Sequence, residues 1–209
     1  MPLVRKPPPG SPDSAAPAPD LAAVLAALAR GTDDERWSAA RTAAALPGSV
    51  AALGEALARE KSSRVREALL TSLARIATPE SVDAVLPLLR SDDALVRTEA
   101  CDALLAMKEV AWPHVAALLH DGDADVRILA CGLVRDMPTE KAVRLYCDLL
   151  GSEPEANVCA AAVEALAEIA GADALPALPA LTRCAERFRA TPFLAFSIQV
   201  VIDRLRPRV

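Results

Sequence analysis

Aromatic side chains account for only 3% of the 209 residues, and the sequence contains only eight glycines. Both are scarce for a protein built from strands, because aromatic residues fill the faces of sheets and glycines form their tight turns. Alanine and leucine are abundant instead, and both favour helices because they lose little side-chain entropy there. The composition therefore argues against a β-sandwich or a β-barrel and predicts an all-α protein.

Three other classes of protein lack support in the sequence. The five cysteines are odd in number and none forms a C-x-x-C pair, so we expect reduced thiols in a cytoplasmic protein rather than a disulfide scaffold. No uncharged apolar run reaches about 18 residues, and prolines 7–9 stand where a signal peptide needs an apolar run, which argues against membrane insertion. The net charge of −5 argues against nucleic-acid binding, which needs a basic surface.

Catalytic motifs are also scarce. The two histidines, His114 and His120, are six residues apart, whereas a helix brings together residues three or four apart, so they are poorly placed to share a metal ion. The sequence has neither a glycine-rich phosphate loop nor a G-x-S-x-G motif. Cys147 and Cys184 fall within predicted helices, where packing is their expected role. We therefore expect a protein that is not an enzyme and needs no cofactor or metal.

Residues 1–20 differ in composition from the remainder. They hold seven of the 17 prolines, together with Gly10, Ser11 and Ser14. A segment of this kind cannot bury a core and is predicted to be a disordered arm rich in proline and alanine. The predicted folded domain therefore spans residues 21–209.

An apolar pattern repeats four times in that domain. Its first residues are Val65, Val96, Val126 and Val158, which are 31, 30 and 32 residues apart. Apolar residues follow each valine at positions +4, +8 and +11, which lie on one narrow face of an α-helix. We call the helix that contains each valine near its start the B helix of its repeat, and we number its positions from that valine.

A shorter apolar helix, the A helix, precedes each B helix. Turn signals such as Thr78-Pro79 and Asp121-Gly122-Asp123 separate the elements. Two less regular pairs flank the four repeats, with predicted helices at 21–30 and 34–46 and at 172–184 and from about 192. Leu194 takes position 0 in the last of them. The sequence thus predicts about six antiparallel helix pairs and no strands.

The motif Asp-x-x-Val-Arg opens two of these B helices, as Asp93-Ala94-Leu95-Val96-Arg97 and Asp123-Ala124-Asp125-Val126-Arg127. This motif and the period near 31 residues resemble HEAT repeats, in particular the short bacterial kind that also occurs in phycobilin lyases. The resemblance implies a right-handed α-solenoid whose A helices line the convex side and whose B helices line the concave side. Such solenoids host many functions, so the resemblance predicts a fold rather than an activity.

Arginine follows the valine in three repeats, at Arg66, Arg97 and Arg127. Aspartates stand shortly before the second and the third of these arginines. A planar guanidinium can bond two carboxylate or carbonyl groups at once. We therefore expect a structural ladder of Asp–Arg links within and between repeats.

Positions +2, +3, +6, +9 and +10 of each B helix point away from the core side. They carry carboxylates and a central apolar patch, which predicts a protein-binding surface on the concave face. A solvated helix face accounts for the charges, but not for Ile128 and Leu129. A partner helix with basic and apolar residues would complement this surface. The residues assigned to it are Glu99, Asp102, Leu105, Ile128, Leu129, Arg135, Asp136, Glu164 and Glu168.

The last predicted helix carries Phe193, Phe196 and Val200 on the side that faces away from its core residues. A terminal repeat is normally polar on its outer side, because nothing stacks beyond it. Two interpretations stay open. Either a neighbouring segment covers these side chains, or they form a docking patch for a partner or for a second copy in a homodimer.

The sequence therefore predicts a non-enzymatic scaffold or adaptor that binds a partner protein on the concave face in a bacterial cytoplasm. Two alternatives stay open. One is a chaperone similar to phycobilin lyases that attaches a tetrapyrrole to a partner protein. The other is a regulatory subunit of a bacterial signalling complex, such as a chemosensory or kinase array.

Overall fold

The computed structural model describes residues 20–169 and 171–205, so the predicted arm lies outside it apart from Asp20. Within the described part all regular structure is helical and forms six helix pairs, which confirms the predicted all-α fold. The A helices are α1 (Leu21–Arg30), α3 (Val50–Arg59), α5 (Pro79–Val85), α7 (Trp112–Leu118), α9 (Thr139–Ser152) and α11 (Leu178–Arg187). The B helices are α2 (Asp33–Ala43), α4 (Ser63–Ile76), α6 (Ala94–Met107), α8 (Ala124–Val134), α10 (Ala156–Glu168) and α12 (Pro192–Leu205).

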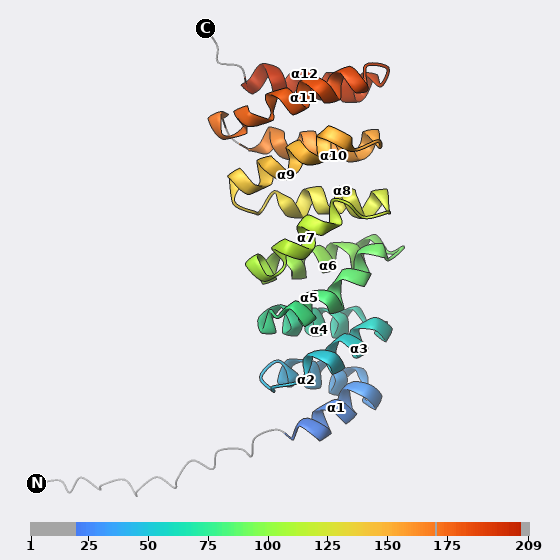
Figure 1. Cartoon of the computed structure of the whole chain (residues 1–209). Helices are drawn as coiled ribbons and strands as arrows, with labels where there is room; N and C mark the ends of the chain where they lie inside the picture. Colours follow the sequence, from blue (N-terminus) through green and yellow to red (C-terminus); the bar gives the residue numbers. More distant parts are fainter. Residues whose placement is uncertain (1–19, 170, 206–209) are drawn as a thin grey trace, which may run out of the picture.

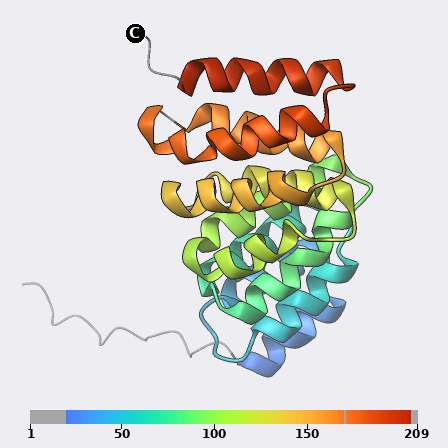
Figure 2. The same cartoon turned by 45° about the horizontal axis from the view of Figure 1, so that its top comes forward.

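The six pairs stack one upon another, from α1 at one end to α12 at the other (Figure 1). Each B helix contacts the B helix of the neighbouring pair along the whole series from α2 to α12. Figure 2 shows the same stack tilted so that its C-terminal end, with α12 outermost, comes forward. The arrangement is the predicted α-solenoid.

The last A helix differs from its prediction as a single helix over residues 172–184. Residues Gly171–Ala177 form a 3₁₀ segment, η3, and α11 begins only at Leu178. Pro176 and Pro179 explain the difference, because proline lacks an N–H donor and disfavours the helical conformation of the residue before it. Two further 3₁₀ segments, η1 (Leu86–Arg90) and η2 (Lys108–Val110), lie beside α5 and α7.

The core follows the predicted period. The valines at position 0 are buried in all four regular repeats, and the residues at +4 and +8 are buried with them. Leu73, Leu104 and Leu166 at +8 are each at most 1% exposed. Burial of one such side chain stabilises the fold by about 1.5–3 kcal/mol, so the repeated face of the B helices supplies much of the driving force for stacking.

Arg127 joins two neighbouring repeats. Its Nε and Nη2 atoms donate to the two carboxylate oxygens of Glu153 at 2.9 and 2.8 Å, and its Nη1 donates to the carbonyl of Asp121 at 2.8 Å. Glu153 lies between α9 and α10 of the next repeat, where it also accepts the backbone N–H of Glu155 at 2.9 Å. The guanidinium therefore fastens two interhelical loops of adjacent repeats to each other.

The same arrangement, in which an arginine binds both carboxylate oxygens of a glutamate in the next repeat, occurs at the N-terminal end. We call it the clasp. Arg36 donates to both carboxylate oxygens of Glu60, at 2.8 and 3.0 Å, and to the carbonyl of Gly31 at 2.8 Å. Glu60 lies five residues before Val65, as Glu153 lies five residues before its own valine. The identical bonding places Arg36 at position +1 of α2 and so fixes the register of the first pair.

The Asp–Arg links expected for the ladder arginines are wrong, because Arg66 and Arg127 take glutamates as their carboxylate partners. Aspartates pair with other arginines, as Asp121 does with Arg90 of the preceding repeat. Asp93 and Asp123 instead accept the backbone N–H groups of Leu95 and Asp125, at 2.8 and 2.9 Å, so they act as N-caps. An aspartate side chain that caps its own helix is not free to reach an arginine one repeat away.

The three predicted ladder arginines also differ from one another. Arg66 donates from Nε to an oxygen of Glu99 at 2.5 Å. Arg97 has no carboxylate partner in the described part of the chain and donates only to the carbonyl of Ser91, at 2.6 Å. The place that Glu60 and Glu153 hold in their repeats is taken by Ser91 in the third repeat, so Arg66 finds no glutamate there. In the fourth repeat it is taken by Asp121, whose carboxylate pairs with Arg90 rather than Arg97, so the clasp is confined to repeats with glutamate at that place.

Candidate protein-interaction surface

Two adjoining hollows indent the solvent-facing side of the B helices. One lies between α2 and α4 and has a volume of about 490 Å³. The other lies between α4 and α6, with a volume of about 510 Å³. Glu67, Thr71 and Arg75, at positions +2, +6 and +10 of α4, line both of them. These three positions therefore lie on the solvent-facing side of the B helices, which we call the groove.

The hollow between α2 and α4 is basic. Arg41 and Arg64 place their guanidinium carbons 4.7 and 4.9 Å from the centre of the Trp37 ring, within the range of a cation–π interaction. Arg64 also pairs with Asp34 at 2.5 Å, and Arg75 lines the same hollow. This cluster could not be predicted from the sequence, because the first repeat matches the period too weakly to show which residues of α2 share a face.

Three of the predicted surface residues are not available as expected. Glu99 lines the second hollow, but its carboxylate is held by Arg66 and its side chain is only 20% exposed. Ile128 and Leu129 are half-buried and pack against the core. The predicted central apolar patch is therefore reduced to Leu105, which is 36% exposed. Leu95, at position −1 of α6, is 56% exposed and was not predicted.

The other predicted surface residues are solvent-exposed. Asp102, Asp136 and Glu164 are exposed and form no ion pair within residues 20–169 and 171–205. Arg135 and Glu168 are about half exposed and pair with each other at 2.7 Å, which joins α8 to α10. A pair this exposed contributes about 0–1 kcal/mol, so it competes weakly with a ligand.

Phe193, Phe196 and Val200 on α12 are also exposed, by 51%, 71% and 43%. No described segment covers them, although residues 206–209 lie outside the described part. They are the largest exposed apolar side chains of the C-terminal pair, where Leu175 is 37% exposed. A patch of this kind indicates an interaction surface.

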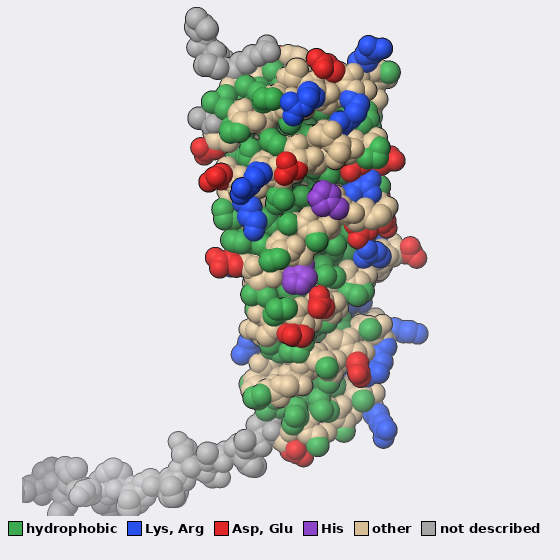
Figure 3. All heavy atoms as spheres, viewed as in Figure 1, with side chains coloured by type: hydrophobic (Ala, Val, Ile, Leu, Met, Phe, Trp, Pro, Cys, Tyr) green, Lys and Arg blue, Asp and Glu red, His purple; other side chains and the backbone are tan. Residues whose placement is uncertain are grey.

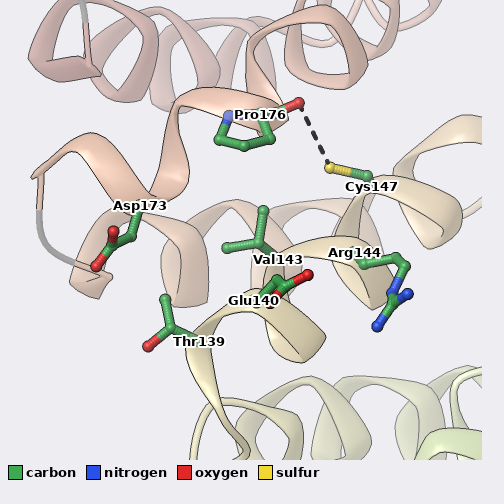
Figure 4. Close-up of a pocket in the computed structure, with 7 residues that line it drawn as sticks. All are labelled: Thr139, Glu140, Val143, Arg144, Cys147, Asp173 and Pro176. Carbon is green, nitrogen blue, oxygen red and sulfur yellow. Dashed lines mark hydrogen bonds between the residues drawn. The ribbon is translucent and has the colours of Figure 1, made fainter.

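The face formed by the A helices carries a different hollow, with a volume of about 760 Å³. Figure 4 shows its lining, which consists of Thr139, Glu140, Val143, Arg144, Cys147, Asp173 and Pro176. The Cys147 thiol donates to the carbonyl of Pro176 at 3.9 Å, and burial raises the pKa of this thiol. No histidine lines the hollow to act as a base, so the geometry does not support a nucleophilic cysteine.

Alkylation of Cys147 by iodoacetamide near neutral pH is expected to be several-fold slower than alkylation of free cysteine. The thiolate is the reactive species, and a raised pKa lowers its population at neutral pH. Quantitative peptide mass spectrometry measures the rate, and the urea-unfolded protein is the control in which the difference should disappear. A rate equal to or above that of free cysteine would contradict the raised pKa of Cys147 and indicate an activated thiol.

The histidines do not form a site together. Both lie on the face shown in Figure 3, well apart, and His114 is 3.5 Å from Asp83. Among the described residues, no group of three or more histidine, cysteine or acidic side chains is arranged to hold a metal ion. None of the described helices combines the length and the apolar character needed to cross a membrane.

Comparison with solved structures finds likeness at low sequence identity. One of the solved structures similar to this chain is an engineered protein, with 19% identity and a TM-score of 0.41; the match covers 87% of this chain and 94% of the engineered one. Another is the complex of CpcE and CpcF of phycocyanin lyase from Nostoc sp. PCC7120, with 18% identity and a TM-score of 0.43; the match covers 95% of this chain and 100% of that chain. A search of curated proteins gives no match. Neither structural likeness assigns an activity to this chain.

A family model described as HEAT repeats matches residues 50–119 and 112–191. The two matches together span the second to fifth helix pairs and the whole of the sixth A helix. The period, the stacked helix pairs and this match agree: the chain belongs to the HEAT-repeat family.

Proposed function

We propose that the protein is a non-enzymatic scaffold that holds a partner protein on the groove face of its B helices. The observation that carries the proposal is the pair of adjoining hollows on this face, lined by exposed polar and apolar side chains at equivalent positions of successive repeats. A surface repeated in this way suits an extended or helical segment of another protein, which can contact several repeats at once.

Charge indicates the character of the partner. Asp102 on α6 and Glu164 on α10 present carboxylates without basic neighbours in ion-pair distance, and Asp136, just beyond the end of α8, is also unpaired within the described residues. A basic partner segment would gain from these charges and would associate faster at low salt. The partner proposed for the part of this surface from α6 to α10 is therefore a helix with basic and apolar side chains, whereas the basic hollow between α2 and α4 would suit an acidic group of the same partner.

The double variant Asp102→Lys/Glu164→Lys should reduce capture of the partner by about tenfold or more, since like charges oppose each other across an interface. Affinity capture from an extract of the source cells, followed by quantitative mass spectrometry, measures this loss. Glu99 is left unchanged because its replacement would also break the bond to Arg66. Circular dichroism should show that the variant remains folded.

The matched control is Glu140→Lys/Asp148→Lys, which places the same charge change on exposed positions of α9 in the A-helix layer. This control should retain the partner. The proposal fails if the groove variant captures the partner as well as the wild type does, or if both variants lose it equally.

A further inference from the structure

The positions of Phe193, Phe196 and Val200 on α12 show which way these side chains face. Counted from Leu194 at position 0, they stand at −1, +2 and +6. On α4 the positions +2 and +6 belong to Glu67 and Thr71, which line both groove hollows. Phe193, Phe196 and Val200 on α12 therefore lie on the same side of the stack as the groove hollows.

Other positions face the next repeat. Arg127 at +1 of α8 bonds to Glu153 beyond it, and Cys131 at +5 is directed at the carbonyl of Val158, 4.0 Å away. On α12 these positions hold Ala195 and Gln199, the small and polar side chains expected where a stack ends.

Gln199 is exposed and donates from Nε2 to Asp203 at 2.8 Å. The end of the stack is thus closed by polar groups, whereas the phenylalanines lie on the groove side. This corrects the expectation that they belong to the outer end of the terminal repeat.

The groove leading to this patch is acidic. On α6, α8 and α10 the exposed carboxylates of Asp102, Asp125 and Glu164 have no ion-pair partner in the described part of the chain. Arg135, the exposed basic residue among them, is tied to Glu168. A ligand that runs along the groove from α6 to α12 therefore meets negative charge first and an apolar surface last.

We propose that Phe193, Phe196 and Val200 are the apolar anchor site of the scaffold's groove, and that its occupant is a basic helix with an apolar cluster at one end. The inference rests on the proposed function and specifies its partner. Neighbouring B helices are about 8–10 Å apart, so three steps from α6 to α12 match a helix of roughly 20 residues. A fully buried phenylalanine covers on the order of 150–250 Å², and Phe193 and Phe196 keep 51% and 71% of their surface exposed for burial by the anchor.

A second copy fits the patch less well. A stable dimer buries about 800 Å² on each partner, which is more than three partly exposed side chains supply. The unpaired carboxylates of the groove also find no charge complement on the same groove of a second copy. Charge complementarity thus favours a basic partner over self-association.

The test uses the full chain and synthetic peptides of about 20 residues in fluorescence anisotropy. The probe peptide is an amphipathic helix with lysines along one face and a Leu-Trp pair at one end. One comparison peptide has serines in place of Leu-Trp, and another has glutamates in place of lysines. Wild-type protein should bind the probe at least tenfold more tightly than either comparison peptide.

The variant Phe196→Ser should weaken binding of the probe by about tenfold, yet leave binding of the serine peptide nearly unchanged, because both changes remove the same contact. Val200→Asp is a second variant with the same expected result. Leu175→Ser is the matched control, since Leu175 is a similarly exposed apolar residue on η3, and it should bind as the wild type does. Circular dichroism should show all three variants folded.

The anchor assignment is overturned if Phe196→Ser and Val200→Asp bind the probe like the wild type, or if the glutamate peptide binds as tightly as the probe. Light scattering that shows a wild-type dimer and a Phe196→Ser monomer would assign the patch to a second copy instead. If Phe196→Ser still captures the cellular partner while Asp102→Lys/Glu164→Lys does not, the scaffold function stands and the anchor inference falls.

Discussion

Replacing Arg127 with alanine is expected to lower the free energy of unfolding by about 3–5 kcal/mol. The variant would leave the carboxylate of Glu153, whose side chain is only 3% exposed, without its charged partner. It would also leave the carbonyl of Asp121 without its donor. Domains of this kind are stable by about 5–15 kcal/mol, so the loss would be a large fraction of the total. Urea denaturation followed by circular dichroism measures it.

Two variants serve as controls for this prediction. Arg135→Ala breaks the exposed pair with Glu168 and should cost less than about 1 kcal/mol. Arg97→Ala removes one bond to a carbonyl and should cost about 1 kcal/mol. The double variant Arg127→Met/Glu153→Gln should recover part of the loss, because it also removes the unpaired buried charge. Equal destabilisation by Arg127→Ala and Arg135→Ala would show that the clasp does not hold the repeats together.

The repeat and its core could be predicted from the sequence because they depend on local periodicity. Apolar residues at positions 0, +4, +8 and +11 must share a helix face, whatever lies next to that helix. Local periodicity does not show which residues of adjacent repeats contact each other. Glu153 is 26 residues from Arg127 in the sequence, and only the stacking of repeats brings the two together.

Two of the three misassigned surface residues have the same physical cause. Glu99 and Leu129 both occupy position +3, and Ala68 at the same position of α4 is buried. Helical periodicity places +3 away from the core, but in a stack this position faces the preceding repeat. Glu99 accordingly meets Arg66 of that repeat rather than solvent. A single helix reveals its own polar face, whereas the direction of its neighbours comes from the assembled solenoid.

Replacing Tyr146 with alanine is expected to destabilise the protein by about 3–5 kcal/mol, as for other large buried side chains. Tyr146 lies on α9, is fully buried, and donates its hydroxyl to the carbonyl of Cys131 at 2.6 Å. Cys131 belongs to the last turn of α8, where carbonyls have no donor within the helix. The side chain therefore fills the core and also completes the hydrogen bonding of the preceding B helix.

The variant Tyr146→Phe separates these two roles. It keeps the ring and removes the hydroxyl, so it should cost only about 1–3 kcal/mol, the range for one buried carbonyl left without a donor. Urea denaturation of both variants under the same conditions gives the comparison. If Tyr146→Phe is as unstable as Tyr146→Ala, the hydrogen bond to Cys131 dominates and the packing argument is wrong. If it is as stable as the wild type, the hydrogen bond to Cys131 adds nothing to stability, and Tyr146 stabilises the junction between the fourth and fifth repeats through apolar packing.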